Sequence, residues 1–193
     1  MTTRTRIIVS RQWPIVTYKG VEFQVMISEG EVQARLHELA SDISTLSGDT
    51  QPVIMGVLNG AVYIVADLSR LLSITHLLGF IGVSSYGDST TAQHEPQITN
   101  DLSCPVVGKD VWLVEDIVET GSTVADVKRH LLQQGAKSVK VCCLLRKIID
   151  GKPCLVQPDL VGFVVPHEFV VGCGLDHQKF YREMPFVGVP VEH

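Results

Sequence analysis

Residues 111–127 read VWLVEDIVETGSTVADV, and this stretch decides the fold. Its first four residues are apolar, as in a short buried strand. Two adjacent acids, Glu115 and Asp116, follow them, and a third acid, Glu119, precedes Thr-Gly-Ser-Thr at 120–123. The hydroxyls, the flexible glycine and the backbone N–H groups at a helix start suit a phosphate dianion.

The three acids beside this phosphate nest need a partner of their own, because a carboxylate in direct contact with phosphate would repel it. Carboxylates a few ångströms away are useful when the ligand also carries vicinal hydroxyls, which donate hydrogen bonds to anions. A sugar phosphate has both groups. Acidic pairs and hydroxyl-rich turns also occur separately as solvated turns or helix caps. Their order directly after a buried strand favours a ligand site, with phosphate on 120–123 and ribose on the acids.

Strands and helices are predicted to alternate on both sides of this stretch. Ser28-Glu-Gly-Glu31 fits a capping box, followed by apolar residues at helical spacing up to Gly48. Further helices are expected at 62–72 and 122–134, and strands at 52–57, 77–83, 111–114, 138–145 and 160–165. This alternation predicts an α/β fold in one domain spanning 1–193, a mainly parallel twisted sheet flanked by helices. Ligands bind beyond the carboxyl ends of such strands, which points to the loops after residues 57, 114 and 145.

The bulk properties exclude some classes of function. The chain has 193 residues, 45% of them hydrophobic and 19% charged, and its net charge of −5 argues against nucleic acid as main partner. No apolar run approaches the roughly 18 residues of a membrane span, and the N-terminus lacks a signal peptide. We therefore expect a cytoplasmic protein without a membrane partner. The cysteines, read as reduced thiols, are 104, 142, 143, 154 and 173.

Two segments carry a resemblance to a known family. VEDIVETGST at 114–123 resembles the phosphoribosyl-diphosphate signature of type I phosphoribosyltransferases, and FVVPHEFVVGCGLD at 163–176 resembles the purine-binding hood of their hypoxanthine-guanine branch. Matching pieces extend from about residue 52 to the C-terminus. The resemblance implies the type I phosphoribosyltransferase fold, with a small hood from about 160–193 plus the N-terminal segment. It also implies a long mobile lid over about 84–110.

The resemblance assigns roles around the phosphate nest. It places the ribose 2′ and 3′ hydroxyls on Glu115 and Asp116. Glu119 stands where the purine branch usually has aspartate, the acid/base near purine N7; a carboxylate one methylene longer can still accept and return that proton. The 5-phosphate is expected on Thr120, Gly121, Ser122 and Thr123.

Other residues are assigned to the purine. The resemblance makes Lys147 the donor to the 6-oxo group, with Arg146 beside it as competing candidate. An ammonium has donors and no acceptors, so it prefers an oxo group to an amino group. Phe169 is expected to stack on the purine face, and the backbone at Val170 to read its edge. The lid is expected to begin with Ser84, Ser85 and Tyr86 and to exclude water during reaction.

The remaining assignments concern pyrophosphate and metal. Asn59 and Gly60 align with the pyrophosphate loop, where the family often has lysine at the position of Asn59, and Arg182 is expected to reach pyrophosphate. We predict a cis peptide at Leu58–Asn59, against the alternative of an ordinary Asn-Gly turn. Magnesium (Mg2+) is expected near Asp176, with the two ribose acids also in reach.

These assignments imply one reaction. It is transfer of phosphoribose from phosphoribosyl diphosphate to N9 of a 6-oxopurine, hypoxanthine and also guanine, giving the nucleoside monophosphate and pyrophosphate in purine salvage. The alternatives are a transferase that prefers xanthine, and a regulator that binds nucleotide or RNA on the same scaffold. The partners are expected to be small-molecule substrates, in a homo-dimer or homo-tetramer.

Overall fold

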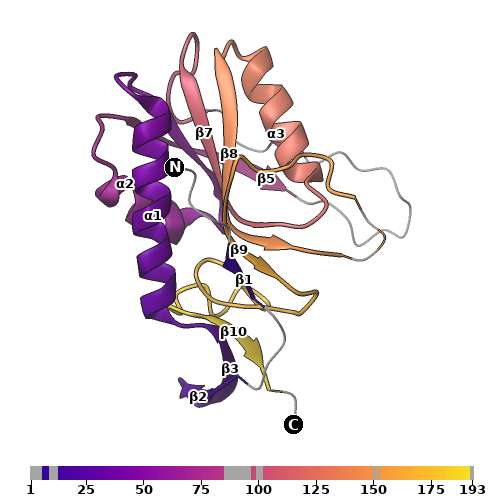
Figure 1. Ribbon diagram of the computed structural model, residues 1–193. Helices are drawn as coiled ribbons and strands as arrows, with labels where there is room; N and C mark the ends of the chain where they lie inside the picture. The colour runs from indigo at the N-terminus through magenta and orange to yellow at the C-terminus, as the bar shows by residue number, and fades with distance from the viewer. Residues whose placement is uncertain are drawn as a thin grey trace.

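A mainly parallel sheet lies between two layers of helices at the centre of the molecule (Figure 1). The computed structural model describes residues 6–8, 13–84, 97–98, 102–149, 151 and 153–191. In this part of the chain the large sheet has the order β1-β9-β8-β7-β4-β5-β6, and only β6 runs antiparallel to its neighbour. Its strands are β1 (Arg6–Ile7), β4 (Val53–Leu58), β5 (Leu77–Ser84), β6 (Gln97–Ile98), β7 (Asp110–Val118), β8 (Ser138–Lys147) and β9 (Leu160–Val165).

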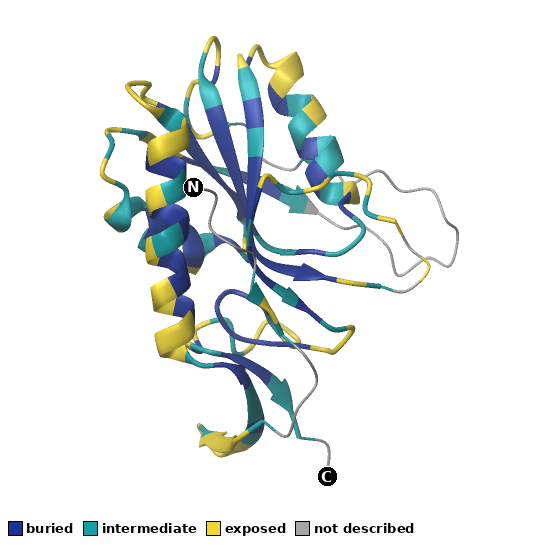
Figure 2. Cartoon of the chain, viewed as in Figure 1, coloured by how far each residue is buried: buried dark blue, intermediate teal, exposed yellow. Residues whose placement is uncertain are grey.

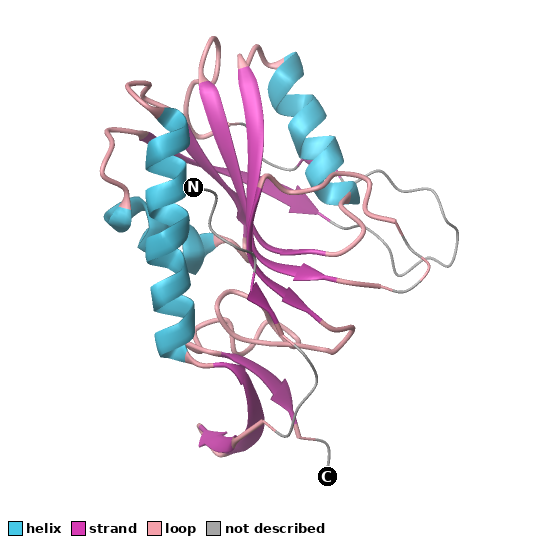
Figure 3. Ribbon diagram, in the orientation of Figure 1, coloured by secondary structure: helices cyan, strands magenta, loops and turns pink. Residues whose placement is uncertain are grey.

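Helices cover both faces of this sheet, as predicted (Figure 3). α1 (Glu29–Ser47) and α2 (Val62–Leu71) pack on one face, and α3 (Ser122–Gln133) packs on the other. Successive strand side chains point to opposite faces. Cys142 accordingly belongs to the core under α1 and α2, and Cys143 to the core under α3. The central strands are buried along most of their length (Figure 2).

The capping box that starts α1 is confirmed. The Ser28 hydroxyl accepts a hydrogen bond from the Glu31 backbone N–H at 3.4 Å, and the Glu31 carboxylate accepts from the Ser28 N–H at 2.9 Å. On the predicted apolar side, Leu36, Leu39 and Ile43 are buried, whereas Leu46 in the last turn is 46% exposed. Local sequence chemistry thus fixes where this helix begins and which side faces the sheet.

A second, antiparallel sheet joins the two ends of the chain. It has the order β10-β3-β2 and consists of β2 (Ile15–Tyr18), β3 (Val21–Ile27) and β10 (Val187–Pro190). We expected no strand after 160–165, so β10 was missed. Its four residues, VGVP, carry no strand period, and pairing with β3 supplies what the local sequence lacks. Strand β9, inside the range expected for the hood, belongs to the large sheet.

Two central strands extend further than predicted. β7 ends at Val118 instead of 114, and β8 ends at Lys147 instead of 145. Polar residues at their ends pair with neighbouring strands, although their composition indicates a loop. In the expected lid, Ser84 ends β5, while Ser85 and Tyr86 lie outside the described residues. No helix in the described ranges is long and apolar enough to cross a bilayer.

Candidate active site

The acidic pair lies on strand β7, toward the carboxyl-end edge of the sheet where we expected ligands to bind. Glu115 pairs in register with Cys143 of β8 and is only 6% exposed. Asp116 is less buried, and its carboxylate accepts a hydrogen bond from the Ile117 N–H at 2.7 Å. Rigid strand backbone therefore orients both carboxylates, which we had expected in a loop after residue 114.

Both carboxyls have raised pKa values. Burial raises the pKa of Glu115 well above its usual range, and the neighbouring charge of Asp116 adds to this. Burial also raises the pKa of Asp116, while the Ile117 N–H and the charge of Arg182 oppose the shift. The charge of Asp176 raises the Asp116 pKa further. Two close acids that resist ionisation favour ligands that bring positive charge or hydrogen-bond donors.

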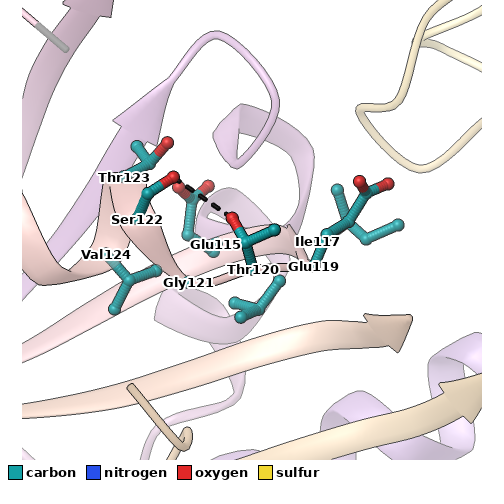
Figure 4. A pocket seen from close by; sticks show the side chains of 9 residues that line it. Glu115, Ile117, Glu119, Thr120, Gly121, Ser122, Thr123 and Val124 are labelled. Carbon is teal, nitrogen blue, oxygen red and sulfur yellow. Dashed lines mark hydrogen bonds between the residues drawn. The ribbon is translucent and has the colours of Figure 1, made fainter. Parts of the chain in front are cut away.

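The phosphate nest follows directly at the start of α3. Gly121 has a φ of 75°, and the Thr120 and Ser122 hydroxyl oxygens lie 3.2 Å apart (Figure 4). A pocket of about 220 Å³ is lined by Glu115, Ile117, Val118, Glu119, Thr120, Gly121, Ser122, Thr123 and Val124. The structure thus brings together Glu115, one of the acids expected at ribose, with the acid/base candidate and all four residues of the expected nest.

A loop outside the predicted site supports this bend. The Leu155 N–H donates to the Thr120 carbonyl at 2.8 Å. A Cβ on Gly121 would lie 3.0 Å from the Cys154 sulfur and 3.1 Å from the Val156 nitrogen, so the positive φ and the close surroundings both favour glycine. The sequence analysis did not anticipate this support, because residues 153–156 have no recognisable pattern of their own.

Glu119 and Lys147 form an ion pair across the strand ends. The Lys147 Nζ atom lies 2.6 Å from Glu119 Oε1; the lysine side chain is 10% exposed and the glutamate side chain 41%. The Glu119 carboxylate stands apart from the Thr120 and Ser122 hydroxyls in Figure 4. The competing candidate Arg146 instead donates to the Val118 and Glu119 carbonyls, at 3.0 and 2.7 Å. The geometry therefore favours Lys147 as the group that meets a ligand.

The expected pyrophosphate loop packs against Asp116, one of the two acids expected to bind ribose. The Leu58–Asn59 peptide is cis, as predicted, and Asn59 is exposed. A Cβ on Gly60 would lie 1.8 Å from an Asp116 carboxylate oxygen, and one on Gly174 would lie 1.8 Å from the Gly60 carbonyl oxygen. Only glycine at both positions permits this approach of three chain segments, and Gly174 was missed as part of the site.

The hood residues divide into exposed and buried groups. Phe169 is 54% exposed and meets His177 edge-on at 5.4 Å, whereas the Val170 side chain is 4% exposed and belongs to the core. Phe169 can therefore offer its ring to a ligand, and Val170 only its backbone. Asp176 pairs with Arg182 at 2.5 Å and accepts the Lys179 N–H at 2.7 Å.

Comparisons with known proteins agree with this geometry. The family described as "Phosphoribosyl transferase domain" matches residues 28–178. The chain belongs to the phosphoribosyltransferase family. It is 39% identical over 166 residues to a hypoxanthine-guanine phosphoribosyltransferase of Bacillus subtilis, covering 86% of this chain and 92% of that one. It is 36% identical to the hypoxanthine phosphoribosyltransferase of Escherichia coli K12, covering 86% and 93%.

A solved structure supports the same family assignment. The hypoxanthine-guanine phosphoribosyltransferase of Bacillus anthracis, crystallised with a HEPES molecule in its active site, superposes with a TM-score of 0.80 at 33% identity. The match covers 86% of this chain and 98% of that one. The type I fold expected from the sequence is therefore confirmed, together with membership of the hypoxanthine-guanine branch.

Divalent metal would suit the oxygen donors of this phosphoribosyltransferase. Glu115, Asp116 and Asp176 offer carboxylate oxygens, which hard cations prefer. Burial raises the pKa of the first two, which makes their charged forms costly without a counter-charge. Among the described residues, no three His, Cys, Asp or Glu side chains converge closely enough to hold an ion alone. The remaining ligands would have to come from substrate oxygens and water.

Proposed function

We propose that this chain transfers the 5-phosphoribosyl group from phosphoribosyl diphosphate to N9 of hypoxanthine or guanine in purine salvage. The observation that carries the proposal is the Glu119–Lys147 pair at 2.6 Å beside the phosphate nest. A 6-oxopurine protonated at N7 presents an acceptor, O6, next to a donor, N7–H. An ammonium beside a carboxylate is complementary to that edge, whereas the amino group of adenine would meet the ammonium donor to donor.

The proton balance of the reaction follows from the same pair. The N9 lone pair forms the bond to ribose C1′ as the bond from C1′ to pyrophosphate oxygen breaks. The purine then loses its N7 proton to the Glu119 carboxylate, while Lys147 stabilises the 6-oxo oxygen. The protein's contribution is mainly to position two substrates and accept one proton.

The other substrate would occupy the contiguous bend. The 5-phosphate binds Thr120, Gly121, Ser122 and Thr123, and the ribose hydroxyls donate to Glu115 and Asp116. Asn59 and Gly60 offer backbone N–H groups to pyrophosphate, with Arg182 supplying positive charge. When bound, Mg²⁺ neutralises the leaving pyrophosphate, held near Asp176 and the two ribose acids through oxygen and water.

Assembly and location complete the proposal. We assign the enzyme to a homo-dimer or homo-tetramer, to be measured by analytical ultracentrifugation. Five free cysteines fit the reducing cytoplasm, where disulfides are rare.

Xanthine is a second candidate acceptor. It also carries a 6-oxo group, so Lys147 does not reject it, and a solved relative at 32% identity and TM-score 0.76 is named hypoxanthine-guanine-xanthine phosphoribosyltransferase. A regulator that binds nucleotide or RNA is the other alternative, suggested by Asn59 and Glu119, which depart from the family pattern. The net charge of −5 opposes RNA binding.

A purine panel tests these alternatives. Hypoxanthine, guanine, xanthine and adenine are each assayed with phosphoribosyl diphosphate and magnesium. We expect turnover of hypoxanthine and guanine, and kcat/KM for adenine lower by about 100-fold or more, because a buried donor would be left unpaired. Preference for xanthine would select that alternative. Absence of turnover with all four bases, together with tight RNA binding, would select the regulator.

A further inference from the structure

Arg146 occupies an unusual place between the two strands that carry the proposed purine-reading pair. It is 7% exposed at the penultimate position of β8, and its guanidinium is bound by main-chain oxygens. Nη1 donates to the carbonyls of Val118 at 3.0 Å and Glu119 at 2.7 Å, and also contacts the Lys147 carbonyl. One side chain therefore joins the ends of two neighbouring strands.

The bridge lies where ordinary strand pairing stops. The last register pair between β7 and β8 is Val118 with Arg146, and Lys147 pairs with Val165 of β9 instead. Beyond Val118, no backbone pairing between β7 and β8 fixes Glu119 relative to Lys147. Arg146 supplies the missing connection, since it bonds the main-chain carbonyls of both residues whose side chains meet at 2.6 Å.

We propose that Arg146 is a positioning residue that sets the separation of Glu119 and Lys147, and with it purine binding and proton transfer. The inference rests on the proposed function. Hydrogen bonds from a buried charged donor to carbonyl oxygens are strong, and removal of the donor leaves those oxygens without a partner. The strand ends would then relax, and displacement of a catalytic pair by about 1 Å can lower a rate by about 100-fold.

Arg35 provides a matched comparison within the same chain. It is 1% exposed, and it also donates to two backbone carbonyls, Gly162 at 2.9 Å and Val161 at 2.7 Å. Its third contact is the Glu38 carboxylate at 2.6 Å. Arg35 thus joins α1 to β9 and touches no residue of the purine-reading pair. Its loss should affect stability without affecting purine recognition.

The experiment compares Arg146→Met, Arg146→Lys and Arg35→Met with the wild type. Thermal unfolding gives stability, and steady-state kinetics give kcat and the separate KM values for hypoxanthine and phosphoribosyl diphosphate. For Arg146→Met we expect kcat to fall about tenfold or more and the hypoxanthine KM to rise about tenfold, with the phosphoribosyl diphosphate KM within about twofold of wild type. Arg146→Lys retains a cationic donor without the guanidinium geometry, so it should recover part of the loss and leave the hypoxanthine KM raised about threefold. Arg35→Met should lower the melting temperature and leave both KM values unchanged.

The outcomes separate this inference from the proposed function. If the wild type turns over hypoxanthine but Arg146→Met resembles Arg35→Met, the positioning role is wrong and the proposed function stands. Equal weakening of both substrates would also overturn the role. If Arg146→Met does not fold, Arg146→Lys decides: a hypoxanthine KM raised about threefold with unchanged phosphoribosyl diphosphate KM supports the role, and wild-type values refute it. A wild type inactive on every purine refutes both.

Discussion

The proposed phosphate side and the proposed purine side of the site are built in different ways. The phosphate side is nearly contiguous, running from Glu115 to Thr123 through one strand end, one bend and one helix start. The purine side is assembled from separate segments, with Lys147 on β8, Phe169 in the hood and Glu119 on the bend. A contiguous site depends on local backbone chemistry. An assembled site depends equally on the groups that hold its segments together.

Replacing Glu119 should give the largest change, because this residue lies where the two sides meet. Glu119→Gln removes the proton acceptor and the charge that pairs with Lys147. We expect kcat to fall about 10²- to 10⁴-fold, while the dissociation constant for phosphoribosyl diphosphate changes by less than about threefold. Single-turnover kinetics and calorimetry measure the two quantities. Asp126→Asn, which removes a carboxylate paired with Arg129 on α3, is the control. Unchanged kcat at every pH would show that Glu119 is not the acid/base.

Gly174→Ala tests whether the hood must touch the pyrophosphate loop. Gly174 has a φ of 102°, and a Cβ there would lie 1.8 Å from the Gly60 carbonyl oxygen. We expect a loss of about 3 kcal/mol in the free energy of unfolding and weaker phosphoribosyl diphosphate binding. Denaturant titration and calorimetry measure these effects.

Gly20→Ala is the matched control for backbone conformation alone. Gly20 has a φ of 85° with no atom within 4 Å of a Cβ built there. Gly20→Ala should lower the free energy of unfolding only by the cost of the backbone conformation, about 1 kcal/mol. Equal losses in the two variants would mean that the Gly174–Gly60 contact contributes nothing.

The same contrast explains how far the sequence could predict the structure. The capping box at Ser28 and the helix start at 122 follow from local periodicity and turn chemistry, and both appear. Strand β10, the bridge made by Arg146 and the fit of Gly174 against Gly60 depend on segments that are distant in sequence. No local sequence pattern indicates which distant segments of backbone will come into contact. These features could therefore be identified only from the structure.

Lys147→Ala should affect the purine side alone. Loss of a charged donor to the 6-oxo group is expected to raise the hypoxanthine KM about 10- to 100-fold and to reduce discrimination against adenine. The phosphoribosyl diphosphate KM should change less. Lys140→Ala is the control on the same strand, because Lys140 lies over the Trp112 ring at 5.3 Å. A larger effect on phosphoribosyl diphosphate than on purine would place Lys147 on the other side of the site.

The smallest expected change concerns the stability of the free protein and its dependence on pH. Burial and the Asp116 charge place the folded pKa of Glu115 above the unfolded value near 4.5. The unfolded state therefore loses this proton at lower pH than the folded state. Stability from this group is highest below about pH 4.5 and falls as the pH rises through the folded pKa. Above the unfolded pKa, this group therefore lowers the stability of the free protein.

Glu115→Gln should consequently stabilise the free protein, by about 1 kcal/mol or a few degrees in Tm at pH 7.5, in buffer with a chelator. The gain should shrink toward zero near pH 4, where wild-type Glu115 is neutral too. Glu31→Gln gives the opposite sign, because hydrogen bonds from Ser28 lower the pKa of Glu31 and stabilise its charged form. Phosphoribosyl diphosphate with magnesium should raise the wild-type Tm more than that of Glu115→Gln. If Glu115→Gln is less stable than the wild type at neutral pH, the fold itself stabilises the Glu115 carboxylate. The group is then not kept in an unfavourable state for the sake of ribose binding.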